Sequence, residues 1–205
     1  VKKIVPTPPP SNSQQRLAAL VGRLCQVVGD TTINKQRKSA APDAEACASI
    51  EAMLAFLKRE QRRLEGEIAS MIDDDPLWAK LADTWRELKG VARRTIAWLH
   101  ADLPEIGTLS NKAIAKLAGL APIANDSGKR KGKRPTRGGR AGVRSILFLV
   151  AAIVARYDQS LGEFRDRLLK AGKEKMVVRI ALARKLLVRL NAKAREARAQ
   201  YAIAT

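Results

Sequence analysis

One segment of this 205-residue chain gathers the residue types that chemistry on a phosphate group needs. Residues 119–142, here called the basic segment, read GLAPIANDSGKRKGKRPTRGGRAG and contain one serine, Ser127. Glycines allow backbone amides to approach phosphates closely, and arginine can donate two N–H groups to one phosphate. We therefore predict nucleic-acid contact here, with a solvated basic loop as the alternative. The predicted contact residues are Lys129, Arg130, Lys131, Lys133, Arg134, Arg137, Arg140 and, just beyond the segment, Arg144.

Ser127 could act as a nucleophile only with help from other groups. A serine that attacks a phosphodiester must lose a proton, and negative charge gathers on the phosphoryl oxygens, so cations or metal ions must surround it. Cations follow Ser127 directly, but the sequence offers no evident base. Asp126 is adjacent, where an Asx turn or a cap explains it equally well. His100, the only histidine, lies 27 positions away and is expected to be structural.

The charge of the chain points to a polyanionic partner. The formal net charge is +19, and residues 111–205 carry 23 of the 39 Lys and Arg residues but only 6 of the 20 Asp and Glu residues. A cationic field concentrated in one half indicates nucleic acid or an anionic membrane. The longest uncharged apolar run, residues 145–155, is well short of the roughly 20 residues that a spanning helix needs. We therefore expect no membrane-spanning segment.

The potential metal ligands and thiols do not form a recognisable site. Cys25 and Cys47 are not part of a CxxC pair, so neither a disulfide scaffold nor a zinc ribbon is indicated, and we expect a reducing compartment, the cytoplasm. Three carboxylates, residues 73–75, precede Pro76 and could hold a metal. Negative charge at a helix N-terminus is the favoured interpretation. We predict no metal site in this chain.

The elements that must position the basic segment are all helical. Apolar residues recur at helical spacing and no strong β-alternation occurs, so we predict an all-α fold. Residues 1–13 are an extended linker, and residues 14–72 form a long helical coiled-coil arm because Ile50, Leu57, Leu64 and Met71 fall seven apart. Residues 73–205 form a compact helical domain that carries the basic segment as a glycine-rich loop.

Within this domain we expect helices near residues 78–88, 91–101, 111–118, 143–154, 161–171 and 175–200. Apolar residues cover nearly the whole circumference over 143–154, which predicts a buried central helix. The last helix has an apolar stripe and an opposite basic face that either follows phosphates or is simply solvated. The stripe is Met176, Ile180, Ala183, Leu187 and Leu190, and the basic face is Lys175, Lys185, Arg189 and Lys193.

Several motifs in order carry a resemblance over about residues 88–192. They are LPEIGTLSNKAIAKLAGLAPI, DSG, RGGRAGVR, a hydrophobic helix, and AGKEKMVVRIALARKLLVRLNA. Together they resemble the C-terminal domain of the DEDD-type insertion-sequence transposases, which are bridge-RNA-guided recombinases. The resemblance implies an enzyme in which an N-terminal RuvC-like domain supplies four carboxylates that bind Mg²⁺. It also implies that Ser127 is the nucleophile, that DNA and a guide RNA are partners, and that the protein is a homo-oligomer.

The same resemblance leads to an expectation about this chain alone. A RuvC-like domain would precede residue 14, where the chain has no room for it, so we expect the chain to bind DNA without cleaving it. Two other classes remain open from the residues: a non-enzymatic basic helical module that binds DNA or RNA, and an interaction protein that acts through its coiled coil. The aromatic content of 4% argues against a stacking platform for single strands.

Overall fold

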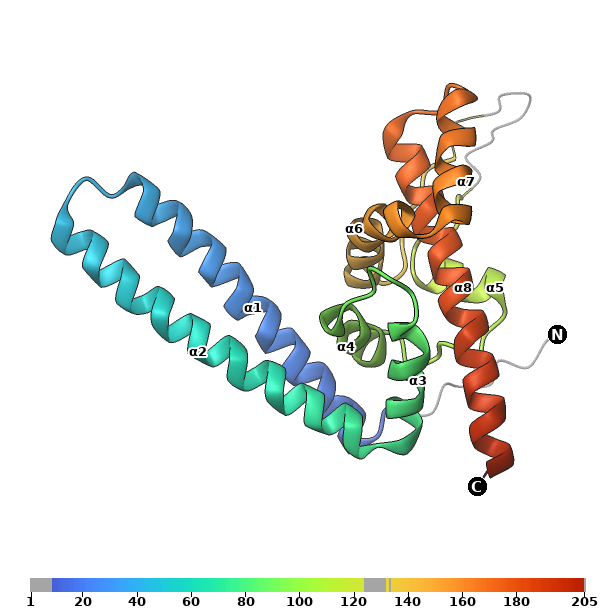
Figure 1. Cartoon of the computed structure of the whole chain (residues 1–205), viewed down its shortest axis with the longest axis horizontal. Helices are drawn as coiled ribbons and strands as arrows, with labels where there is room; N and C mark the ends of the chain where they lie inside the picture. Colours follow the sequence, from blue (N-terminus) through green and yellow to red (C-terminus); the bar gives the residue numbers. More distant parts are fainter. Residues whose placement is uncertain (1–8, 124–131, 133, 205) are drawn as a thin grey trace. The chain divides into compact units, whose positions relative to one another are not determined.

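The computed structural model describes residues 9–123, 132 and 134–204, and within them the regular structure is entirely helical. Eight helices follow one another in the described chain, which confirms the predicted all-α class (Figure 1). Two compact units make up the chain, residues 1–71 and residues 72–205. The helices are α1 (Asn12–Ala40), α2 (Ala44–Asp74), α3 (Pro76–Arg86), α4 (Arg93–Asp102), α5 (Asn111–Leu117), α6 (Ala141–Tyr157), α7 (Gln159–Lys170) and α8 (Lys175–Ala204).

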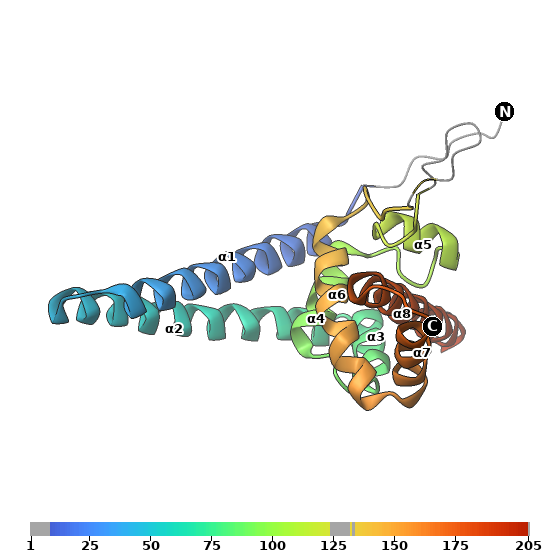
Figure 2. The same ribbon diagram turned by 90° about the horizontal axis from the view of Figure 1, so that it is seen from above.

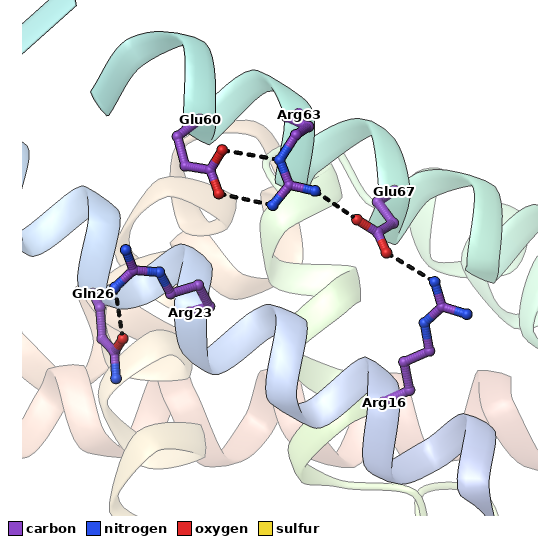
Figure 3. A network of polar contacts seen from close by, with 6 residues as sticks. All are labelled: Arg16, Arg23, Gln26, Glu60, Arg63 and Glu67. Atoms are coloured by element: carbon purple, nitrogen blue, oxygen red, sulfur yellow. Dashed lines mark hydrogen bonds and ion pairs between the residues drawn. The ribbon is translucent and has the colours of Figure 1, made fainter. Parts of the chain in front are cut away.

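The first unit is an antiparallel hairpin of α1 and α2. Ion pairs join Arg16 to Glu67 near one end and Lys38 to Glu51 near the other. Figure 3 shows that Arg63 also lies between Glu60 and Glu67, within hydrogen-bonding distance of both carboxylates. Exposed pairs of this kind add little stability. The buried apolar residues of the hairpin do more to hold it together, and they are Leu17, Val21, Leu24, Val27, Leu57, Leu64 and Ile68.

The second unit is built around α8. Helices α3, α5, α6 and α7 all pack against α8, which runs through this unit (Figures 1 and 2). The indole Nε1 of Trp85, a fully buried side chain of α3, donates to the backbone oxygen of Leu190 at 3.1 Å. The buried residues of α8 itself are Val178, Leu182, Ala183, Leu186, Leu187, Leu190, Asn191, Ala194 and Ala197. The site described below is positioned by the contacts of this one helix.

Two expectations about α8 are corrected by these contacts. Met176 was expected in the apolar stripe, but its side chain is 62% exposed because α8 becomes buried only from Val178 onward. The basic face is engaged within the protein for three of its four members. Lys185 lies over the ring of Phe164, Arg189 pairs with Asp158, and Lys193 pairs with Glu87.

Helix α6 is also less buried than its sequence predicts. Val143, Leu147 and Val154 are buried, in agreement with its packing against α4, α7 and α8. On the opposite face, Leu149 is 55% exposed and Ile153 is 45% exposed. The neighbouring helices cover only one side of α6, so the expectation of a helix that is buried all round is wrong.

The start of α3 and the interior of α4 follow the sequence interpretation. Asp75 is the N-cap of α3, and its carboxylate accepts from the backbone N–H groups of Leu77 and Trp78. His100 is buried, with its ring 5.7 Å from that of Trp78 and 5.0 Å from that of Trp85. Burial, with the nearby positive charge of Arg198 as a smaller cause, lowers the pKa of His100 to about 3. Among the helices of the described residues, none has an apolar stretch of the length that spanning a bilayer requires.

The buried imidazole makes stability depend on pH. The pKa of His100 is about 3 in the folded protein and near 6.5 when unfolded, so protonation favours the unfolded chain as pH falls through this interval. Between about pH 6 and pH 4 this group should reduce the unfolding free energy by roughly 1.4 kcal/mol per pH unit. Urea unfolding of the wild type and of His100→Gln should therefore give a steeper loss for the wild type. Equal slopes would show that the imidazole titrates normally in the fold.

Candidate nucleic-acid interface

A linker between α4 and α5, residues 103–110, is fixed to α8 by one buried amide side chain. Asn191 has no exposed surface, and its Oδ1 accepts from the backbone N–H of Gly107 at 2.8 Å. Its Nδ2 donates to the backbone oxygen of Leu109 at 3.1 Å and to Oδ1 of Asn111 at 3.0 Å. A buried amide that is satisfied on both sides fixes the position of the backbone that it contacts.

The linker can lie this close to α8 because residue 107 is glycine. Gly107 has a φ of +87°, and a Cβ there would come within 2.9 Å of the backbone carbon of Ala194. Two arginines of α8 add hydrogen bonds to linker carbonyl groups. Arg198 donates to Ile106 and Pro104, and Arg195 donates to Leu109. The LPEIGTLSN motif is therefore the part of the chain that α8 holds in place.

Helix α5 follows the linker and is also held in place, by a side-chain cap at its start and by its packing on α8. Ser110 caps it by accepting from the backbone N–H of Ala113 at 3.3 Å. Ile114 and Ala115 are fully buried, and α5 packs on α8. The helix ends at Leu117, and Gly119, two residues later, has a φ of +67° that suits a residue without a Cβ.

The two ends of the basic segment meet next to α5 and form a structure here called the neck, residues 117–123 and 134–140. The backbone N–H of Ile123 donates to Pro135 at 3.0 Å, and that of Arg140 donates to Leu117 at 2.8 Å. Gly139 lies so close to the opposite side that a Cβ on it would come 2.5 Å from the backbone oxygen of Leu117. The neck is therefore a backbone-to-backbone contact that depends on glycine.

Arg140 ties the neck to the linker. Its guanidinium donates to both carboxylate oxygens of Glu105 at 2.6 Å each, and to the backbone oxygen of Asp102 at 2.8 Å. Burial by itself raises the pKa of Glu105, but the hydrogen bonds from Arg140 hold that pKa below its usual value. A bidentate Arg–carboxylate pair is among the stronger polar contacts and fixes orientation as well as distance.

Arg144, one turn into α6, also holds the neck in place. Its guanidinium donates to the backbone oxygen of Gly138 at 2.7 Å, and thus supports the returning side of the neck. Close by, the carboxylate of Asp102 would lie 3.4 Å from a Cβ on Gly142, near the start of α6. Burial raises the pKa of Asp102, although the charge of Arg140 opposes that effect. Asp102 is thus a carboxylate beside the neck with a pKa above its usual value.

The predicted site residues fall into three groups in the structure. Arg134 and Arg137 are exposed on the neck. Arg140 and Arg144 are half-buried and form the contacts described above. The remaining predicted residues lie outside the described part of the chain, and they are Ser127, Lys129, Arg130, Lys131 and Lys133.

Sequence reasoning missed two residues that set this geometry and two exposed lysines on α5. Glu105 is 35 positions from Arg140 and Asn191 is 84 positions from Gly107, so no local spacing indicates either contact. Lys112 and Lys116 are exposed on α5, but two lysines in a short helix are too ordinary a pattern to attract notice. The sequence drew attention to Glu105 and Asn191 only because both lie within motifs that carry the family resemblance.

The neck offers a matched pair of glycines for a test. Gly138 and Gly139 both have positive φ, but a Cβ on Gly138 would meet nothing within 4 Å. Gly138→Ala should therefore cost only the left-handed backbone penalty of about 1 to 2 kcal/mol. Gly139→Ala should cost clearly more in unfolding free energy because its Cβ meets the backbone across the neck. Equal losses in urea unfolding would contradict a tight neck.

Part of this chain is similar in sequence to known proteins. Residues 82–167, which include the linker, α5 and the neck, match the family described as "Transposase IS116/IS110/IS902 family". The chain is also similar to two curated proteins. It is 32% identical over 130 residues to the "Pilin gene-inverting protein" of Moraxella bovis, covering 61% of this chain and 40% of that protein.

The second relative is the "Insertion element IS110 uncharacterized 43.6 kDa protein" of Streptomyces coelicolor (strain ATCC BAA-471 / A3(2) / M145). The identity is 28% over 150 residues, covering 72% of this chain and 36% of the relative. This chain thus spans well under half the length of both relatives. Over residues 82–167, which include the linker, α5 and the neck but not α8, the chain is similar to the transposases of the IS116/IS110/IS902 family.

Proposed function

We propose that this chain is the DNA-binding, serine-nucleophile part of an insertion-sequence transposase, which cuts and rejoins DNA through a phosphoserine link. One observation carries the proposal. The neck fixes both ends of the segment that contains Ser127 and its cations to a helical unit, and this arrangement lies within the region that is similar to transposases. A reactive loop on a rigid scaffold is the usual way in which proteins present catalytic residues.

The proposed step conserves the phosphodiester energy. The Oγ of Ser127 attacks the phosphorus atom of the DNA backbone and loses its proton to a base, one P–O bond to the sugar breaks, and the departing sugar oxygen takes up a proton. The phosphoserine link can then be attacked by another sugar hydroxyl, which rejoins DNA and restores the serine. Such a transition state needs fixed positive charge around the phosphoryl oxygens.

The described cations contribute to this step in different ways. Arg134 and Arg137 are exposed on the neck, and in the proposal they contact the DNA backbone on either side of the segment. Arg140 and Arg144 support the neck, so in the proposal they act first as positioning residues. Phosphate contact by Arg140 would exchange one charged partner, Glu105, for another.

The metal chemistry belongs to another domain in this proposal. Among the described residues, no group of three or more His, Cys, Asp or Glu side chains is arranged to hold a metal ion. A RuvC-like domain would supply the carboxylates for Mg²⁺, which would stabilise charge on the phosphoryl oxygens. Recognition of the DNA through a guide RNA and assembly into a homo-oligomer are further parts of the proposal, and both rest on the family resemblance.

The nucleophile is tested by removing one oxygen atom. In a protein that joins this chain to a RuvC-like domain, Ser127→Ala should preserve DNA binding and abolish the covalent protein–DNA adduct, because no other atom forms the phosphoester. The adduct is measured on denaturing gels with magnesium and guide RNA present, and binding by gel shift.

Ser145→Ala is the matched control, since Ser145 is exposed on α6 close to the neck in sequence. The control should form the adduct at the wild-type level. An adduct that persists in Ser127→Ala would remove this serine from the mechanism and favour a binding module without strand cleavage.

A further inference from the structure

We infer that α5 carries a second phosphate-binding site, in which Lys112 and Lys116 bind the backbone of a DNA duplex beside the neck. The inference rests on the proposed function and extends it to residues outside the basic segment. It follows from the exposure of these lysines, their spacing, the charge around them and the rigidity of α5.

The two lysines form a matched pair on one side of the helix. Both are exposed, and neither forms an ion pair with any residue in the part of the chain that the structure describes. Residues four apart share a helix face and are separated by about 6 Å along the axis. Successive phosphates of one DNA strand advance by about 3.4 Å along the duplex axis. The separation of the two lysines therefore corresponds to about two phosphate-to-phosphate steps.

The stretch of sequence that contains α5 is strongly one-sided in charge. From residue 106 to residue 157 the sequence contains a single acidic residue, Asp126. Glu105, just before this stretch, is already neutralised by Arg140. The two lysines and the exposed arginines of the neck therefore add to one positive field, because no described carboxylate from residue 106 to residue 157 opposes them.

The position of α5 is fixed before DNA binds. Its inner face is fully buried at Ile114, Ala115 and the following Ala118, and its start is held through the contact of Asn111 with Asn191. The neck begins at its last residue, Leu117, whose backbone oxygen accepts from the backbone N–H of Arg140. A rigid support leaves only the lysine side chains to be ordered on binding, which lowers the entropic cost.

A duplex fits this surface better than an unpaired strand. Binding of single strands relies on aromatic side chains that stack on bases, and neither α5 nor the neck residues include Phe, Tyr or Trp. Contacts from lysine and arginine to phosphates carry no base information by themselves. The site is therefore expected to bind the duplex backbone with little sequence preference.

The test measures how salt affects the affinity of the full chain for a DNA duplex. Each phosphate contact contributes about 0.9 to the slope of log affinity against log salt concentration, so Lys112→Gln with Lys116→Gln should reduce that slope by about 1.8. Replacement of the same two residues by Arg keeps the charge and should retain the wild-type slope. Thermal unfolding of each variant establishes that the fold is intact.

Lys58→Gln with Arg62→Gln is the matched control, since both residues are exposed on α2, four apart, with the same loss of charge. The control should leave the slope unchanged. If the α5 and control variants shift the slope equally, or if the α5 variant weakens only binding to single-stranded RNA, the α5 site is overturned while DNA binding stands. If the wild-type chain does not bind duplex DNA at all, the proposed function itself fails.

Discussion

The buried side chain of Asn191 is the contact on which the geometry of the interface depends. It accepts from Gly107 and donates to Leu109, and thereby fixes the linker against α8. Removal of such a buried partner leaves an unsatisfied backbone group, which costs about 1 to 3 kcal/mol. The linker leads directly into α5, and α5 ends at the neck, so a single amide on the central helix sets where the basic segment leaves the fold.

This arrangement separates rigid support from the groups that meet DNA. Gly107 and Gly139 allow backbone to lie against backbone, and Arg140 with Glu105 joins the neck to the linker. Exposed cations remain on the outside, at the neck and on α5. A phosphoryl-transfer site needs charges that are already in place when the reaction occurs, and a rigid neck meets this need better than a free loop.

Much of the fold could be predicted from local patterns, and the failures share one cause. Helical periodicity and the Asp75 cap of α3 are local features, so the helices follow the sequence closely. The exposed face of α6 and the engaged basic face of α8 were not predictable in the same way. Arg189 pairs with Asp158, which is 31 positions away, and Lys193 pairs with Glu87, which is 106 positions away. Neither pairing can be inferred from local spacing. For the site, residue types indicated the basic segment, but not its attachment through Glu105 and Asn191.

Hydrogen exchange of backbone amides tests most directly whether Asn191 positions the neck. The informative amides are those of Gly107 in the linker and of Ile123 and Arg140 in the neck. In Asn191→Leu, we expect faster exchange at all three amides, with α1 and α2 unchanged as an internal reference. If exchange quickens at Gly107 while Ile123 and Arg140 keep their wild-type protection, the neck is held independently of α8 and the central claim is wrong.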